Sequence, residues 1–86
     1  MTQHGTDAAG PHALAAIEAL HTTLLMARAL HEAGRRIDLA GLDAQAASLC
    51  TAVALLRPAA ARPLRPALVA LAREVDGLRT ALAATA

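Results

Sequence analysis

Apolar residues recur along this chain at intervals of three and four, which is the periodicity of an α-helix. The clearest run carries leucine or valine at six positions spaced 4-3-4-3-4: Leu64, Leu68, Leu71, Val75, Leu78 and Leu82. A middle run has the same kind of spacing: Leu42, Ala46, Leu49, Val53 and Leu56. An earlier run clusters Ile17, Leu20 and Leu24 in one stripe, which also includes His31. The pattern therefore predicts three amphipathic helices.

Glycine, proline and aspartate mark the expected ends of these helices. The Gly10-Pro11 step is a plausible start, because proline is favoured at the first helical position, and Gly34 is a natural C-terminal cap. We therefore expect a first helix over residues 11–33. Asp38 or Gly41 is expected to cap a second helix over 42–56, with Pro58 ending it. Pro63 or Pro66 is then expected to open a third helix over 64–83, after a stiff, solvated connection.

These elements predict an all-α fold: a small three-helix bundle, or a helical hairpin plus a third helix. Residues 1–10 are expected to form a flexible N-terminal tail, and residues 11–86 a single α-helical domain. The 86 residues are 56% hydrophobic but include no Phe, Tyr or Trp. Leucine and alanine must therefore fill the core, which suits closely packed helices. A chain this short buries only about 60–65% of its unfolded surface, so self-association would stabilise it.

Two surfaces are candidate interfaces. The first is the C-terminal run, which resembles a coiled-coil seam in its spacing; the residues expected to make contact are Leu68, Leu71, Val75, Leu78 and Leu82. The second is the far side of the first helix, where small or apolar residues gather: Ala15, Ala19, Thr22, Met26, Ala29 and Ala33. We expect Ala19, Met26 and Ala29 to form the contact patch there. The alternative is that the C-terminal run packs only on the other two helices.

Possible chemistry centres on Glu18 and His21, an E-x-x-H pair on one helical face. Carboxylate-bridged di-iron bundles use this spacing, but the other helices offer no bridging glutamates on their apolar faces. His31 and Glu32 are further candidate ligands, so a metal-binding bundle is the alternative function. The structural reading is that these polar groups border a packed face, with Arg28 and Glu32 forming an i,i+4 pair. Cys50, beside Leu49, is expected to be a buried, inert thiol.

Charge gives little support for a nucleic-acid partner. The net charge is only +1, there are no aromatic side chains for base stacking, and residues 35–56 have only a faint helix-turn-helix outline. A small DNA-binding or regulatory protein is thus a second alternative, in which Arg57, Arg62 and Arg65 would contact an anionic partner. The longest uncharged apolar run, residues 44–56, is shorter than the roughly 20 residues that cross a bilayer, so no transmembrane segment is expected.

Together these patterns favour a small, non-catalytic protein–protein interaction module of the adaptor, chaperone-like or assembly-subunit kind. It is expected to act through leucine and alanine helix faces, as a homodimer or as a subunit of a larger assembly. No cofactor is expected. One cysteine and no apparent signal sequence indicate a cytoplasmic setting.

Overall fold

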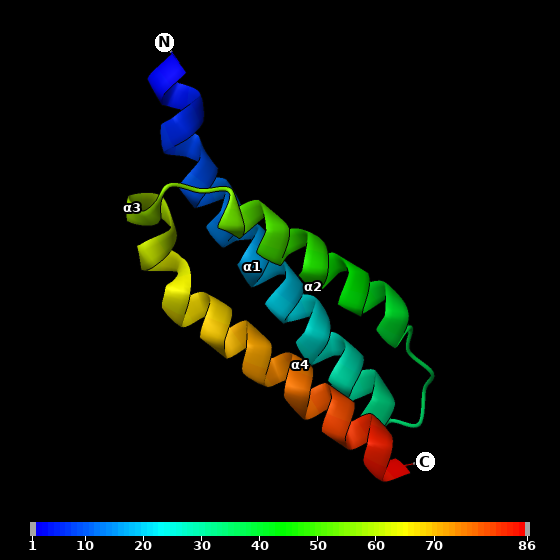
Figure 1. The fold of residues 1–86 in the computed structure, drawn as a ribbon. Helices are drawn as coiled ribbons and strands as arrows, with labels where there is room; N and C mark the ends of the chain where they lie inside the picture. The colour runs from blue at the N-terminus through cyan, green and yellow to red at the C-terminus, as the bar shows by residue number, and fades with distance from the viewer. Residues whose placement is uncertain (1, 86) are drawn as a thin grey trace.

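A computed structural model describes residues 2–85 of the chain, with side chains described from Gly10 to Ala84. Three long helices dominate it (Figure 1): α1 spans Thr2–Glu32, α2 spans Leu39–Ala54 and α4 spans Arg65–Thr85. Between α2 and α4 lie a short helix, α3, at Pro58–Ala61, and a 3-10 turn, η1, at Arg62–Leu64. No strand occurs within the described residues. The predicted all-α fold with three principal helices is confirmed.

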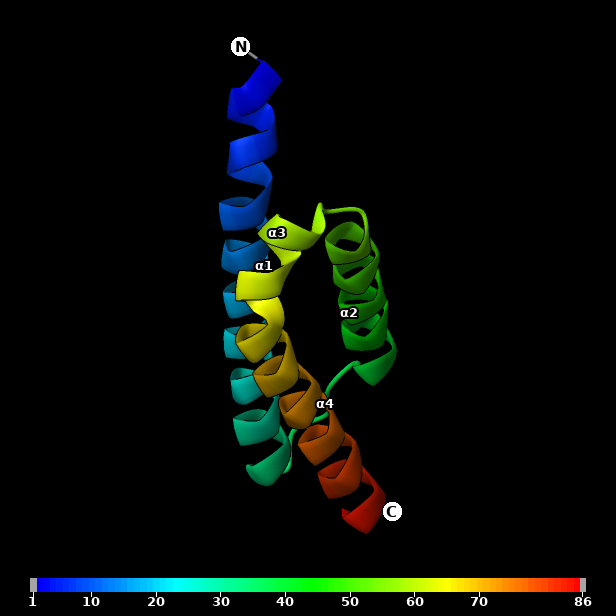
Figure 2. The ribbon, with the colours of Figure 1, turned by 60° about the vertical axis from the view of Figure 1, so that its left-hand side comes forward.

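The long helices run up, down and up, so that α2 is antiparallel to both α1 and α4 (Figures 1 and 2). α1 packs against both of the other long helices, most extensively against α4. The first turns of α1 project past the end of the bundle in both views. The result is a rod of 51 × 18 × 16 Å with a radius of gyration of 14.7 Å. A compact 86-residue chain would have a radius of gyration of about 12 Å.

α1 begins at Thr2, nine residues before the predicted start, and it contains Pro11 in its interior. Proline has a fixed φ that suits a helix, and it interrupts the helix mainly through its missing N–H and its clash with the preceding turn. In this fold α1 nevertheless continues through Gly10 and Pro11. The described residues of the predicted N-terminal tail, 2–10, belong instead to one continuous helix, α1.

The C-terminus of α1 closes as predicted at Gly34, which has φ +82°. The Gly34 N–H donates to the His31 carbonyl at 2.9 Å, and the Arg35 N–H donates to the Leu30 carbonyl at 2.8 Å. This pair of bonds is a Schellman motif, in which glycine takes the left-handed position without a Cβ clash. Asp38 caps α2, where its carboxylate accepts from the Gly41 N–H at 3.0 Å. Of the two predicted caps, Asp38 is the one used.

The proline-rich connection differs from the predicted stiff, solvated elbow. α2 already ends at Ala54, and Pro58 is the first residue of α3 instead of the residue that stops α2. Proline is well suited to this first helical position because its missing N–H would be unpaired there anyway. The connection is therefore helical, and α3 and η1 return the chain toward α1. Pro66 lies in the first turn of α4, as predicted, and Pro63 lies within η1.

The core contains only aliphatic side chains from the three long helices and η1: Ile17, Leu20, Leu24, Ala27, Leu49, Val53, Leu64, Leu71 and Leu78. The three apolar residues of the predicted α1 stripe are thus buried, with Ala27 added to them, whereas His31 is half-buried. The loop side chain Ile37 and the first apolar residues of α2, Leu39 and Leu42, pack against this core.

Candidate functional site

Glu18 and His21 lie on one side of α1, but the structure brings no third ligand to them. Glu18 is exposed and His21 is half-buried. Within residues 10–84, no group of three His, Cys, Asp or Glu side chains is placed to hold a metal ion. A di-iron site needs carboxylates from several helices around one centre. The E-x-x-H pair therefore has the spacing of such a site without its surroundings.

His31, the third candidate ligand, makes a contact between helices. Its Nε2 lies 3.2 Å from the carbonyl oxygen of Ala81 in α4. A carbonyl oxygen only accepts, so Nε2 carries the hydrogen and donates it. His31 thereby joins the C-terminal ends of α1 and α4. The fourth candidate, Glu32, is exposed and lies 3.6 Å from Arg28 in the predicted i,i+4 ion pair.

Arg28 also reaches across to α4, where its Nη1 lies 3.7 Å from Glu74 Oε1. That oxygen is buried and has no hydrogen-bond partner within the described residues. The Arg28 side chain passes beside Gly77, where an added Cβ would lie 3.0 Å from Nη1. Glu74 and Gly77 lie off the leucine run of α4. The helix thus faces α1 through these residues as well as through its leucines.

A second ion pair joins α2 to α4. Arg79 Nη2 donates to Asp43 Oδ1 at 2.8 Å, and both side chains are substantially exposed. The hydrogen bond and the charge of Asp43 raise the pKa of Arg79. Because arginine is protonated throughout the physiological range, this shift has no catalytic use. The charged side chains at this end of the bundle therefore connect helices.

The predicted α4 interface residues divide into two groups. Leu71 and Leu78 are core residues, and Leu78 is fully buried within its own chain. Leu68, Val75 and Leu82 are half-buried and pack against the same core. Within the chain, the seam thus packs on this core, chiefly through the contact of α4 with α1. Leu71 and Leu78 are not accessible to a partner in this fold.

The second predicted patch lies on the surface. Ala19, Met26 and Ala29 are all exposed, and Met26 shows 61% of its surface. They belong to a row of exposed residues spaced 4-3-4-3-4 along α1, which we call the outer face: Ala15, Ala19, Thr22, Met26, Ala29 and Ala33. Leu25 and Leu30 flank this row and are also exposed. Glu18 is the one charged side chain between Pro11 and Leu25.

The mean hydropathy of α1 is a second measure of its apolar character. The segment Gly10–Glu32 has a mean hydropathy of 1.3 over an 18-residue window, and by length and composition it could cross a membrane. A search for uncharged apolar runs does not find this segment, because Glu18 and Arg28 interrupt it. Here one side of the helix packs against α2 and α4, while most of the window remains unburied.

Cys50 is exposed, contrary to the prediction of a buried thiol. Leu49 is buried, but the next residue in a helix is rotated by about 100°. Cys50 therefore lies at the edge of a shallow groove of about 420 Å³ between α2 and α4, beside Ala46 and Leu68. Another groove, of about 490 Å³, lies on the surface between α1 and α2.

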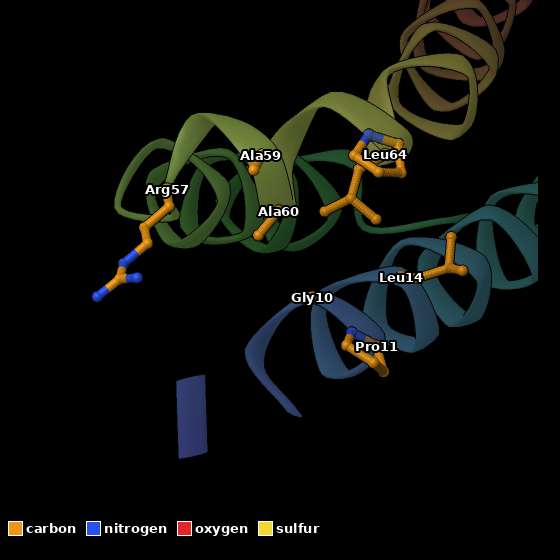
Figure 3. Close-up of a pocket in the computed structure, with 8 residues that line it drawn as sticks. Gly10, Pro11, Leu14, Arg57, Ala59, Ala60 and Leu64 are labelled. Carbon is orange, nitrogen blue, oxygen red and sulfur yellow. The ribbon is translucent and has the colours of Figure 1, made fainter. Parts of the chain in front are cut away.

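A groove of about 540 Å³ lies where residues 10–14 of α1 meet α3 and η1 (Figure 3). Sequence reasoning missed it because the connection was expected to be a solvated elbow. The three arginines of this connection, Arg57, Arg62 and Arg65, are all exposed.

No protein-family model, curated protein or solved structure matches the chain.

Proposed function

We propose that this protein is a small, non-catalytic interaction module that binds another helix through the outer face of α1, with a second copy of the chain as its partner. The observation that carries the proposal is the exposure of this apolar row on the longest helix, while the leucines of α4 are already used inside the chain. Exposed contiguous apolar patches on small proteins often mark sites of association.

The total surface supports a partner. The chain exposes 6021 Å². A compact chain of 8.8 kDa is expected to expose about 4800 Å². The difference of about 1200 Å² is larger than the roughly 800 Å² that each partner buries in a standard interface. Covering the outer face with a second helix would thus bring the surface per chain closer to that of a compact protein.

The residue types on the outer face suit a helix as the partner. Four of its six positions are alanine, so another helix axis can approach to the short end of the usual 8–10 Å range. Met26 is flexible and adapts to irregular neighbours. Thr22 does not oppose this, because its hydroxyl already donates to the Glu18 carbonyl at 3.1 Å. The face can therefore be buried without leaving a new unpaired donor.

The test is a charge placed on the outer face. Ala29→Glu and Met26→Glu are expected to reduce self-association at least tenfold, because a carboxylate buried between helices loses its hydration without gaining a partner. Both positions are exposed in the single chain, so its helicity should be unchanged. Ala44→Glu, at an exposed alanine of α2, is the matched control.

Size-exclusion chromatography with light scattering reports the mass of each variant. A refractive-index detector is needed, since the chain has no Trp or Tyr. The proposal fails if the outer-face variants associate as strongly as the control, or if all of them, with the parent chain, elute as monomers at high micromolar concentration.

A further inference from the structure

The groove at the α1–α3 junction has a built apolar floor. It is lined by Gly10, Pro11, Leu14, Arg57, Ala59, Ala60, Pro63 and Leu64. Seven of these eight residues are uncharged and apolar. At its base α1 and α3 nearly touch, because a Cβ added to Gly10 would lie 3.9 Å from Cβ of Ala60. At about 540 Å³ the groove is in the size range of ligand sites.

Charge is strongly one-sided around this groove. Residues 44–73 include four arginines and no aspartate or glutamate. Arg57 lines the groove, and Arg62 is exposed in η1, next to the lining residues Pro63 and Leu64. Arg65, the first residue of α4, lines the groove between α2 and α4 instead. Among the described side chains, the arginines in ion pairs are Arg28 and Arg79, which bind Glu32, Glu74 and Asp43 elsewhere in the molecule. Arg57 and Arg62 are thus in no ion pair with another described side chain.

We infer that this groove binds an acidic amphipathic segment of another protein. An apolar side chain of that segment would occupy the space between Leu14 and Ala59, and its carboxylates would pair with Arg57 in the groove and with Arg62 in η1. The inference rests on the proposed role as an interaction module, but it uses a surface separate from the outer face of α1. Charge complementarity of this kind sets partner choice and speeds association.

The groove favours a polypeptide over other anions. The groove is open to the surface, so it would not enclose most of a small amphiphile as ligand sites usually do. A nucleic acid would engage the arginines through phosphates but leave the apolar floor uncovered. A membrane surface meets protruding apolar side chains, whereas these line a concavity. A side chain on a helix fits a concave apolar groove with a charged rim.

The test uses a fluorescein-labelled 16-residue peptide with leucine at positions i, i+3, i+4 and i+7 and glutamate at most others. Fluorescence anisotropy with the full-length chain is expected to show saturable binding. The same peptide with lysine in place of glutamate should bind at least tenfold more weakly. Raising the salt concentration should weaken the glutamate peptide, because exposed charge pairs are screened.

Two variants locate the binding. Arg57→Glu and Ala59→Glu are each expected to reduce affinity for the glutamate peptide at least tenfold, since both place a negative charge in the groove. Ala59 is exposed, so its substitution should leave the fold intact, and circular dichroism checks this. Arg35→Glu, at an exposed arginine elsewhere, is the matched control and should change affinity less than twofold. Met26→Glu should likewise leave peptide affinity unchanged.

The inference is overturned if no saturable binding occurs, if the lysine peptide binds equally well, or if Ala59→Glu binds like the parent chain. It is also overturned if phosphatidylglycerol vesicles or duplex DNA bind in an Arg57-dependent way and the peptide does not. Failure here is distinguishable from failure of the proposed self-association, since the latter is read from the mass of the chain alone. A monomer that binds the glutamate peptide would retain this inference and remove the proposed dimer.

Discussion

Single residues decide where this small fold can tolerate change, and two glycines show it most clearly. Gly34 lies at a positive φ that L-residues rarely adopt, whereas Gly77 lies inside α4 with ordinary helical geometry. Both of these glycines lie in or beside a helix. Their roles differ because one ends a helix and the other borders a side chain from another helix. The role of Gly34 was predictable from its position, but the neighbour of Gly77 was not.

Replacing each glycine with alanine should therefore have opposite effects. Gly34→Ala is expected to destabilise the fold by about 1 kcal/mol, because alanine is strained in the left-handed region. Gly77→Ala is expected to stabilise it by up to about 1 kcal/mol through higher helix propensity, since the crowded atom is the mobile end of Arg28. Chemical denaturation followed by circular dichroism measures both. A loss of stability in Gly77→Ala comparable to that in Gly34→Ala would contradict the expectation that this end of Arg28 moves aside at little cost.

Arg28 and Glu74 form the most consequential polar contact between the helices. Glu74 has only 17% of its side chain exposed, and its buried oxygen has no hydrogen-bond partner within the described residues. Arg28→Ala is expected to destabilise the fold by about 1–2 kcal/mol, because it leaves that carboxylate without its compensating charge. The double variant Arg28→Ala with Glu74→Leu should recover part of this loss.

A double-mutant cycle in urea gives the coupling between the two residues. Strictly additive effects would show that the 3.7 Å approach contributes nothing to stability. The pairing was beyond sequence reasoning, because Glu74 lies beside the leucine run and not within it. Only the rotation of α4 relative to α1 brings its side chain toward Arg28.

At the scale of helices, apolar periodicity predicted all three long elements and the residues that α1 buries. It was less accurate at their ends. α1 passes through Pro11, which was expected at its start. The proline-rich connection forms α3 and η1, because proline favours the first turn of a helix as readily as it stops one. The groove was therefore not predictable, since it depends on that helical connection returning to α1. The outer face, by contrast, was visible as small residues at regular spacing.

The contrast between Leu78 and Leu55 tests the assignment of the α4 seam to the core. Leu78 has 0% exposure and Leu55 has 83%. Leu78→Ala is expected to lower the free energy of unfolding by about 3 kcal/mol, as buried leucines typically do. Leu55→Ala should stay within about 0.5 kcal/mol of the parent chain. Denaturation midpoints at one low protein concentration check this. Similar midpoints for the two variants would contradict the burial of Leu78 inside a single chain.

The whole molecule is an elongated rod with a short aliphatic core and a large exterior. Nine of the described residues are buried in that core, and the chain has no aromatic side chain to add to it. A domain this small has limited stability when it stands alone, and association is one common way of increasing it. The outer face and the α1–α3 groove differ in character, the first nearly uncharged and the second bordered by arginines. We propose that they serve different partners, a second copy and an acidic segment.

Sedimentation equilibrium of the unmodified chain over a concentration series tests the central claim most directly. Interference optics are suited to a chain without Trp or Tyr, and a reducing agent prevents disulfide formation through the exposed Cys50. The account predicts that the mass rises with concentration from 8.8 kDa toward twice that value, and that Ala29→Glu prevents the rise. A mass that stays at 8.8 kDa up to high micromolar concentration would contradict it.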